Sequence, residues 1–283
     1  MEIIKTAKDM QAHAEKTRMQ GKTIVFVPTM GFLHEGHLSL LREGSRHGDH
    51  LVLSIFVNPT QFAAGEDFES YPRDFEKDAA AAQKEGVDVI FAPEKANLYD
   101  DDFETYVSLE KLPNHLCGLS RPTHFRGVAT IVTKLFNIVK PHAAVFGEKD
   151  YQQLAIIRRM TRDLNFDIRI IGVPIVREPD GLAMSSRNTY LAPEQRQAAL
   201  SLYRSLSEAQ NMVKTGETRA TRLIEEARRT ISAFPENSID YVTVCDPDTL
   251  EDVALIDRPV LMALAVRVGK CRLIDNMVLH PAG

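Results

Sequence analysis

Two histidines, His34 and His37, lie three residues apart in residues 28–37, which read Pro-Thr-Met-Gly-Phe-Leu-His-Glu-Gly-His. Imidazole rings at this spacing can face one ligand, where they can donate hydrogen bonds to phosphate oxygens or stabilise developing charge. Gly31 and Gly36 let the backbone turn sharply and approach a ligand closely. The helix expected after them offers backbone N–H groups and a positive dipole end. The segment therefore predicts a phosphate site. The alternative is that one histidine caps the helix and the other is packed or exposed.

Two further polar segments carry cationic side chains. Residues 147–153 read Gly-Glu-Lys-Asp-Tyr-Gln-Gln, in which Lys149 can neutralise a phosphate and Asp150 can cap a helix or bind a ribose hydroxyl or a metal. Residues 181–188 read Gly-Leu-Ala-Met-Ser-Ser-Arg-Asn, which offers hydroxyl donors and the rigid fork of Arg187 to a pyrophosphate leaving group. For both segments a helix cap or polar turn beside a surface cation is the alternative.

Amide side chains form a third group of candidates. Asn58 and Gln61 follow a predicted strand, and Gln153 lies one turn into a predicted helix. Amides can hold a small polar substrate without adding charge. Residues 120–127, Ser-Arg-Pro-Thr-His-Phe-Arg-Gly, can clamp an anionic ligand, although surface exposure is the competing interpretation for Arg126.

The elements that must position these residues alternate over the first two thirds of the chain. We expect strands at residues 24–28, 51–57, 87–92, 143–146 and 168–173, and helices near 38–46, 72–85, 128–139 and 151–164. Apolar strands that alternate with helices predict a parallel sheet covered on both faces, with its ligand site at the carboxyl ends of the strands. The segments that begin at residues 29, 58 and 147 follow three of these strands, as such a site requires.

The pattern changes after about residue 175. Two long polar-rich helices, near residues 193–215 and 218–234, precede β segments at 239–245, 260–268 and 271–278, with a hairpin expected at Gly269-Lys270. We therefore predict an α/β fold with a doubly wound parallel sheet in residues 1–175 and a smaller α+β C-terminal domain in residues 176–283.

Composition excludes several classes of protein. The 283 residues include 34 basic and 39 acidic side chains, without a basic stripe typical of a nucleic-acid surface. No apolar run is long enough to span a bilayer, so we expect a soluble chain without a membrane partner. Cys117, Cys245 and Cys271 are widely spaced and form no CxxC pair, which favours a reducing, cytoplasmic location.

Several long motifs occur in a fixed order along nearly the whole chain. They are PTMGFLHEGH, SIFVNPTQF, YPRDFEKD, SRPTHFRGV, VFGEKDYQQL, GVPIVREPDGLAMSSRN and RLIDNMV. In this order they closely resemble the pantothenate synthetases, or pantoate–β-alanine ligases, of the HxGH nucleotidyltransferase superfamily. The resemblance implies a Rossmann-like first domain, a C-terminal domain that acts as a lid, and a homodimer.

The resemblance also implies a two-step reaction. Pantoate would attack ATP, accompanied by Mg²⁺, to give an enzyme-bound pantoyl adenylate and pyrophosphate. The amine of β-alanine would then displace AMP and form pantothenate. No metal ligand is assigned. Asp78 could help to hold Mg²⁺, but we expect it to lie on the solvent side of its helix.

The family's site residues transfer to matching positions of this sequence. The resemblance implies a catalytic group of His34, His37, Lys149 and Arg187, in which the family treats His37 as the catalytic acid. Gln61 and Gln153 would bind pantoate, and Gln61 would also lie against β-alanine. The ATP contacts would be Met30, Gly31, Phe32, Leu33, His34, Glu35, Gly36, His37, Gly147, Glu148, Lys149, Asp150, Val176, Met184, Ser185, Ser186 and Arg187.

Two other functions remain as alternatives. One is a simple nucleotidyltransferase that acts on a phosphorylated substrate, against which the neutral amides Gln61 and Gln153 argue. The other is a nucleotide-binding module without turnover. The complete set of His34, His37, Lys149 and Arg187 argues against this second alternative.

Overall fold

The computed structural model describes residues 1–63 and 65–281, and its contacts divide the chain into two compact units. The first unit contains Met1–Glu110, Arg121–Glu148 and Ile156–Pro174. The second contains Lys111–Ser120, Lys149–Ala155 and the chain from Ile175 onward. Within the described residues, no helix is both long and apolar enough to cross a bilayer.

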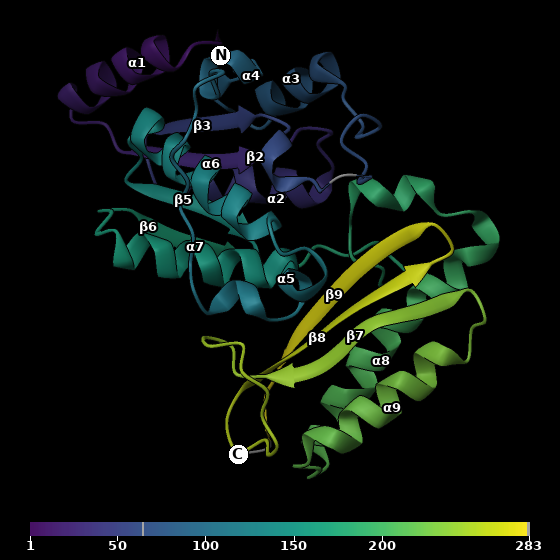
Figure 1. Cartoon of the computed structure of the whole chain (residues 1–283). Helices are drawn as coiled ribbons and strands as arrows, with labels where there is room; N and C mark the ends of the chain where they lie inside the picture. Colours follow the sequence, from purple (N-terminus) through teal and green to yellow (C-terminus); the bar gives the residue numbers. More distant parts are fainter. Residues whose placement is uncertain (64, 282–283) are drawn as a thin grey trace. The chain divides into compact units, whose positions relative to one another are not determined.

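A six-stranded parallel sheet forms the centre of the first unit, in the order β1-β4-β3-β2-β5-β6 (Figure 1). Its strands are β1 Glu2–Ile4, β2 Ile24–Thr29, β3 His50–Ile55, β4 Val89–Phe91, β5 Ala143–Gly147 and β6 Arg169–Val173. The sheet confirms the predicted fold class. The sequence pattern did not predict β1, because this short strand buries only Ile4 and pairs with β4, far along the chain.

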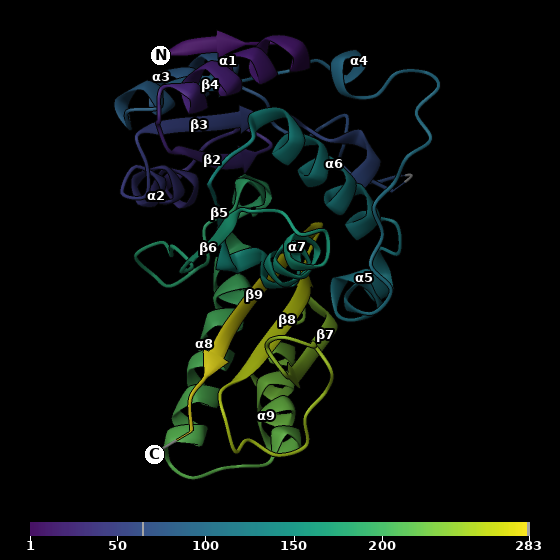
Figure 2. The same cartoon turned by 90° about the vertical axis from the view of Figure 1, so that its left-hand side faces the viewer.

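Helices cover both faces of this sheet. They are α1 Ala7–Met19, α2 Glu35–Gly44, α3 Phe75–Lys84, α4 Lys95–Leu98, α6 His124–Val139 and most of α7 Tyr151–Asp163. On one face, Val25 and Val27 of β2 share a core with Leu40 and Leu41 of α2. Because side chains alternate along a strand, the fully buried Phe26 points to the opposite face. Figure 2 shows α2 and α6 on opposite sides of the central strands.

The second unit is an α+β arrangement, as predicted. Its antiparallel sheet joins β7 Asn237–Cys245, β8 Val260–Val268 and β9 Cys271–Leu279, next to α8 Arg196–Lys214 and α9 Ala220–Ser232. Shorter elements in this unit are α5 Cys117–Ser120, η2 Leu112–Asn114, η4 Ser186–Tyr190 and η5 Pro193–Gln195. Val268 pairs with Cys271, which confirms the hairpin at Gly269-Lys270.

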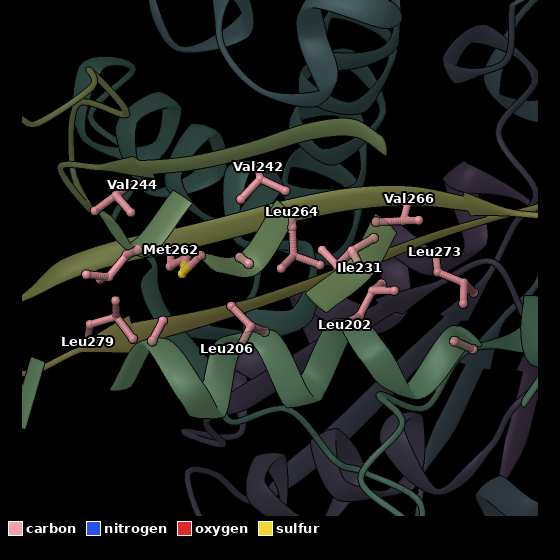
Figure 3. Packing of buried hydrophobic residues seen from close by; sticks show 14 of the residues in the cluster. Leu202, Leu206, Ile231, Val242, Val244, Met262, Leu264, Val266, Leu273 and Leu279 are labelled. Atoms are coloured by element: carbon pink, nitrogen blue, oxygen red, sulfur yellow. The ribbon is translucent and has the colours of Figure 1, made fainter. Parts of the chain in front are cut away.

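The core of the second unit lies between its sheet and its two long helices (Figure 3). Leu202 and Leu206, one helical turn apart on α8, point into it together with Ile231 of α9. Met262 and Leu264 of the central strand face them. All five side chains are at most 1% exposed, so this unit has a hydrophobic core of its own.

His142, just before β5, gives a testable pH dependence. Its Nδ1 accepts the N–H of Ile24 at 2.9 Å, and burial lowers the pKa of His142 from its ordinary value of 6.5. The unfolded chain therefore binds this proton more readily, and the free energy of unfolding should fall as the pH drops below about 6.5.

His142→Asn keeps an oxygen acceptor and removes the titrating ring. Thermal unfolding of this variant between about pH 7 and about pH 5 should depend less on pH than that of the wild type. An unchanged dependence would contradict this assignment.

Candidate functional site

The strand order reverses between β2 and β5. β3 and β4 lie on one side of β2, whereas β5 and β6 lie on the other. In open parallel sheets, ligands bind outside the carboxyl ends of the strands at such a switch point. β2 ends at Thr29 and β5 ends at Gly147, so the histidine segment and the start of residues 147–153 leave the sheet at this edge.

The turn after β2 is held by a buried carboxylate. Gly31 and Phe32 both adopt left-handed conformations, with φ of 82° and 52°. The N–H of Phe32 donates to Asp78 Oδ2 at 2.7 Å, and the N–H of Leu33 donates to Asp78 Oδ1 at 2.6 Å. Asp78 is only 2% exposed, so the expectation that it faces solvent was wrong. Burial raises the pKa of the Asp78 carboxyl, and the two N–H groups oppose this shift.

The two histidines form a reciprocal cap at the start of α2. His34 is the N-cap residue, and its Nδ1 accepts the N–H of Gly36 at 3.1 Å. Nδ1 of His37 accepts the N–H of His34 at 3.3 Å, and the ring centroids lie 4.1 Å apart. Because both Nδ1 atoms accept, the hydrogen of each neutral ring lies on Nε2. Capping is therefore confirmed for His34, and it leaves each Nε2–H as the ring's donor.

This cap corrects one part of the sequence interpretation. We expected the backbone N–H groups of the turn and helix start to bind phosphate. In the structure the N–H groups of Gly31, Phe32, Leu33, His34, Gly36 and His37 donate to atoms of the protein itself. These groups are therefore not the free donors we expected, because side chains accept five of them and the carbonyl of His34 accepts the N–H of His37. The imidazole Nε2 atoms stay the predicted phosphate contacts of this segment.

Asn58 organises the segment after β3. Its Oδ1 accepts the hydroxyl of Tyr99 at 3.0 Å, and its Nδ2 donates to Gln61 Oε1 at 3.2 Å and to the carbonyl of Gly127 at 3.2 Å. Gln61 in turn directs its Nε2 at the sulfur of Met30, at 3.1 Å. A thioether is a weak acceptor, so a substrate oxygen can replace it at little cost. The structure thus brings together two predicted site residues, Gln61 and Met30.

The basic segment at residues 120–127 supports Gln61 and does not form an anion clamp. Arg121 makes two hydrogen bonds to the carboxylate of Glu66, at 2.7 and 2.6 Å, which neutralise its charge. Arg121 and His124 both donate to the carbonyl of Gln61, at 3.2 and 2.8 Å. Arg126 lies over the ring of Tyr106, 4.6 Å from its centroid.

Gly127 provides a test of how tightly this segment is packed. A Cβ atom at Gly127 would lie 2.4 Å from the carbonyl oxygen of Thr60 and 2.7 Å from the backbone nitrogen of Gln61. Gly127→Ala should therefore displace η1 (Pro59–Gln61) and destabilise the fold by about 1–3 kcal/mol. Thermal unfolding followed by circular dichroism measures the loss. Gly147→Ala is the control, because its Cβ would meet only Leu40 Cδ2, at 4.0 Å. Equal loss in both variants would contradict the packing argument.

The predicted site residues from Lys149 onward belong to the second unit. The N–H of Met184 donates to the carbonyl of Val176 at 2.9 Å, so these two predicted ATP contacts are neighbours. Ser185 caps η4, where its hydroxyl accepts the N–H of Arg187 at 3.3 Å. This places Ser185, the buried Ser186 and Arg187 on one short turn.

Two neighbouring residues of β9 hold these segments, and neither received a role from the sequence. The carboxylate of Asp275 accepts hydrogen bonds from both terminal nitrogens of Arg177, at 2.7 and 2.9 Å. Burial raises the pKa of Asp275, and Arg177 opposes this shift. Asn276 donates to the carbonyl of Lys149 at 2.9 Å. The sequence offered only one signal, that both lie in the motif RLIDNMV. β9 therefore supports both Lys149 and Arg177, the residue that follows Val176.

Adjacent glutamines on α7 have different surroundings. Gln152 is buried, and its amide binds the carbonyls of Leu112 and His115 and the N–H of Cys117. Gln153 is half-buried and lies about 100° further around the helix. Gln152 is thus a structural residue, whereas Gln153 stays the predicted pantoate contact.

Removing Asp275 should be costly because Arg177 would lose its partner inside the protein. Asp275→Ala should lower the free energy of unfolding by about 3–5 kcal/mol, the scale for a buried pair that loses one member. The control is Glu225→Ala on α9, which removes an exposed ion pair with Arg222 and should cost less than about 1 kcal/mol. Because the chain lacks tryptophan, urea unfolding is best followed by circular dichroism. If Asp275→Ala lowers the free energy of unfolding no more than Glu225→Ala does, the ion pair between Asp275 and Arg177 contributes little to stability.

The parallel sheet, its switch point and the histidine cap define a Rossmann-like α/β enzyme. A family model described as pantoate-beta-alanine ligase matches residues 2–278. The chain belongs to the pantoate–β-alanine ligase family and is therefore a ligase.

Individual members of the family match this sequence along their full length. The pantothenate synthetase of Desulfatibacillum aliphaticivorans is 63% identical over 281 residues, which cover 99% of this chain and 100% of the relative. That of Thermotoga petrophila is 58% identical over 279 residues, with 99% and 100% coverage.

Solved structures show the same fold. The crystal structure of pantothenate synthetase from Thermus thermophilus gives a TM-score of 0.94 at 42% identity, covering 99% of this chain and 100% of that one. Pantoate-beta-alanine ligase from Francisella tularensis, complexed with beta-gamma ATP and beta-alanine, gives a TM-score of 0.80 at 32% identity. The coverage there is 98% of this chain and 97% of that one.

Proposed function

We propose that this chain joins pantoate to β-alanine through a pantoyl adenylate, with ATP as the second substrate. The observation that carries the proposal is the histidine cap at the switch point, which directs Nε2–H donors from the end of the central strand β2. The family supplies the two substrates, and the Francisella relative was crystallised with a form of ATP and with β-alanine.

The first step is a displacement at phosphorus. A carboxylate oxygen of pantoate forms a bond to the α-phosphorus of ATP, and the bond from that phosphorus to the bridging oxygen breaks. The electron pair leaves with pyrophosphate. Such a step needs alignment of the reactants and donors at the developing charge rather than a covalent nucleophile on the protein. We assign the donors to His34, His37, Lys149 and Arg187, and alignment of pantoate to Gln61 and Gln153.

The second step forms the amide bond. The neutral amine of β-alanine attacks the acyl carbon of the adenylate, the bond from carbon to the phosphate oxygen breaks, and AMP leaves with the electron pair. The amine nitrogen then releases a proton to solvent. The products are pantothenate and AMP. The remaining predicted contacts in residues 30–37, 147–150 and 184–187, together with Val176, hold the nucleotide through both steps.

The hydrogen bonds of His37 favour charge stabilisation over proton transfer. Its Nδ1 accepts the N–H of His34, and a doubly protonated ring would lose that bond. Pyrophosphate also leaves readily without protonation. We therefore assign His37 the role of a neutral donor through Nε2–H.

The proposal includes Mg²⁺ bound to the phosphates of ATP. In the described part of the chain, no group of three or more His, Cys, Asp or Glu side chains is placed to hold a metal ion. Mg²⁺ is commonly bound by substrate phosphates and water with few protein ligands, and it neutralises charge on the triphosphate. We propose that Mg²⁺ enters the site with the nucleotide.

His37→Asn separates the two tasks of the ring. The asparagine oxygen can replace Nδ1 as the acceptor for the N–H of His34, but no donor reaches the position of Nε2. The rate of pantoate-dependent ATP–pyrophosphate exchange should fall by about 10²–10³-fold with little change in the unfolding temperature. His142→Asn, the same substitution outside the cap, is the control. A near-normal rate for His37→Asn would remove His37 from the catalytic group.

The function itself is tested with ATP, Mg²⁺, pantoate and β-alanine, with AMP and pantothenate measured together. The proposal requires both products in equal amounts, and exchange of pyrophosphate with pantoate alone. Exchange that appears only with a phosphorylated alcohol would favour the simple nucleotidyltransferase instead.

Three expectations stay predictions. The homodimer and the cytoplasmic location rest on the resemblance to the family, and the boundary near residue 175 rests on the change in sequence pattern. Sedimentation velocity tests the first of these directly.

A further inference from the structure

We propose that Asp78 is the positioning residue for the catalytic histidines, which it controls through the backbone of the turn before them. The inference rests on the proposed function, because it assigns Asp78 a part in the same site. Asp78 lies on α3, in the first helical turn, and has no place among the predicted substrate contacts.

The carboxylate holds two consecutive N–H groups with separate oxygens. Successive N–H groups in such a turn form a concavity that binds an anion. Here that anion is a side chain of the protein, with donor–acceptor distances of 2.7 and 2.6 Å to Phe32 and Leu33. A left-handed conformation is strained for Phe32, and these charge-assisted hydrogen bonds offset the strain.

The space beneath the turn fits this carboxylate closely. A Cβ atom at Gly31 would lie 2.9 Å from Asp78 Oδ2 and 2.9 Å from Ile55 Cγ2. The turn therefore rests directly on α3 and β3 and cannot shift toward them. A side chain at position 78 that cannot accept both N–H groups should therefore change the turn.

The turn fixes the position of both imidazoles. Leu33, whose N–H binds Asp78, directly precedes the N-cap residue His34. His34 then orients His37 through its own N–H. A displacement at Leu33 therefore moves the first turn of α2 and both Nε2 atoms together. Misplacement of a catalytic group by about 1 Å can lower a rate by about 10²-fold.

Asparagine is the informative substitution because it keeps the size of the side chain. Asp78→Asn retains one acceptor oxygen and points an NH₂ group at the other N–H donor. Asp74→Asn is the matched control on the same helix. Asp74 caps α3 by accepting the N–H of Lys77 at 3.1 Å, and asparagine caps equally well. Both variants remove one negative charge from the first turn of α3.

The first experiment measures hydrogen exchange of the backbone and does not depend on turnover. In Asp78→Asn, amides of residues 32–37 should exchange at least about 10-fold faster than in the wild type, because the turn opens more often. Asp74→Asn should leave this segment unchanged. Unchanged exchange in Asp78→Asn would overturn the inference. If that variant does not fold, Asp78→Ser, which keeps one acceptor without an opposing NH₂, takes its place.

The second experiment tests whether Asp78 acts through the histidines. Asp78→Asn alone should lower kcat for pantothenate formation by at least about 10-fold, with a smaller change in KM for ATP. In a background that carries both His34→Asn and His37→Asn, the same substitution should have little further effect, because residues that act as a unit are not additive. Fully additive losses would show that Asp78 stabilises the fold without positioning the histidines.

The two hypotheses fail in different ways. A wild-type chain that forms no pantothenate rejects the proposed function, and hydrogen exchange then still decides whether Asp78 holds the turn. If the wild-type chain forms pantothenate but the losses from the Asp78 and histidine substitutions are additive, the proposed function stands and the role of Asp78 is rejected.

Discussion

The chain must leave a fully buried strand and enter a helix within a few residues, and its backbone N–H groups must find acceptors as it does so. β2 is central in the sheet, so water cannot serve the turn that follows it as freely as it serves a surface loop. The acceptors come from the side chains of Thr29, Asp78, His34 and His37. Satisfying these donors fixes both the start of α2 and the orientation of the imidazoles. The fold of the first unit and its chemistry thus depend on the same hydrogen bonds.

In the second unit, two adjacent residues of β9 hold the segments that carry predicted site residues. Asp275 binds the side chain of Arg177, and Asn276 binds the backbone of Lys149. Arg177 also donates to the carbonyl of Gly181 and stacks on Tyr203, so one buried carboxylate orders the approach to residues 184–187. In both units, a buried polar side chain supports a segment that carries proposed contacts to the substrate.

The sequence predicted what depends on local pattern. The apolar run at residues 24–28 is β2, and Gly269-Lys270 is a hairpin, because strand burial and turn chemistry are visible within a few residues. The pattern could not show Asp78 beneath Phe32, 46 residues away, or Asn276 beside Lys149, 127 residues away. Such contacts arise only when elements pack. The anion clamp at residues 120–127 failed for the same reason, because Glu66 and the carbonyl of Gln61 already occupy Arg121.

The histidine cap limits which substitutions this protein can accept during evolution. Active-site residues commonly reduce the stability of an enzyme, so their loss is often stabilising. His34 and His37 instead satisfy backbone donors that would otherwise be unpaired at the start of α2. A substitution that removes these acceptors should therefore lower stability together with the activity proposed for them. The usual compromise between stability and activity is absent at this cap, because selection for stability retains an acceptor at the same two positions that the proposed activity uses.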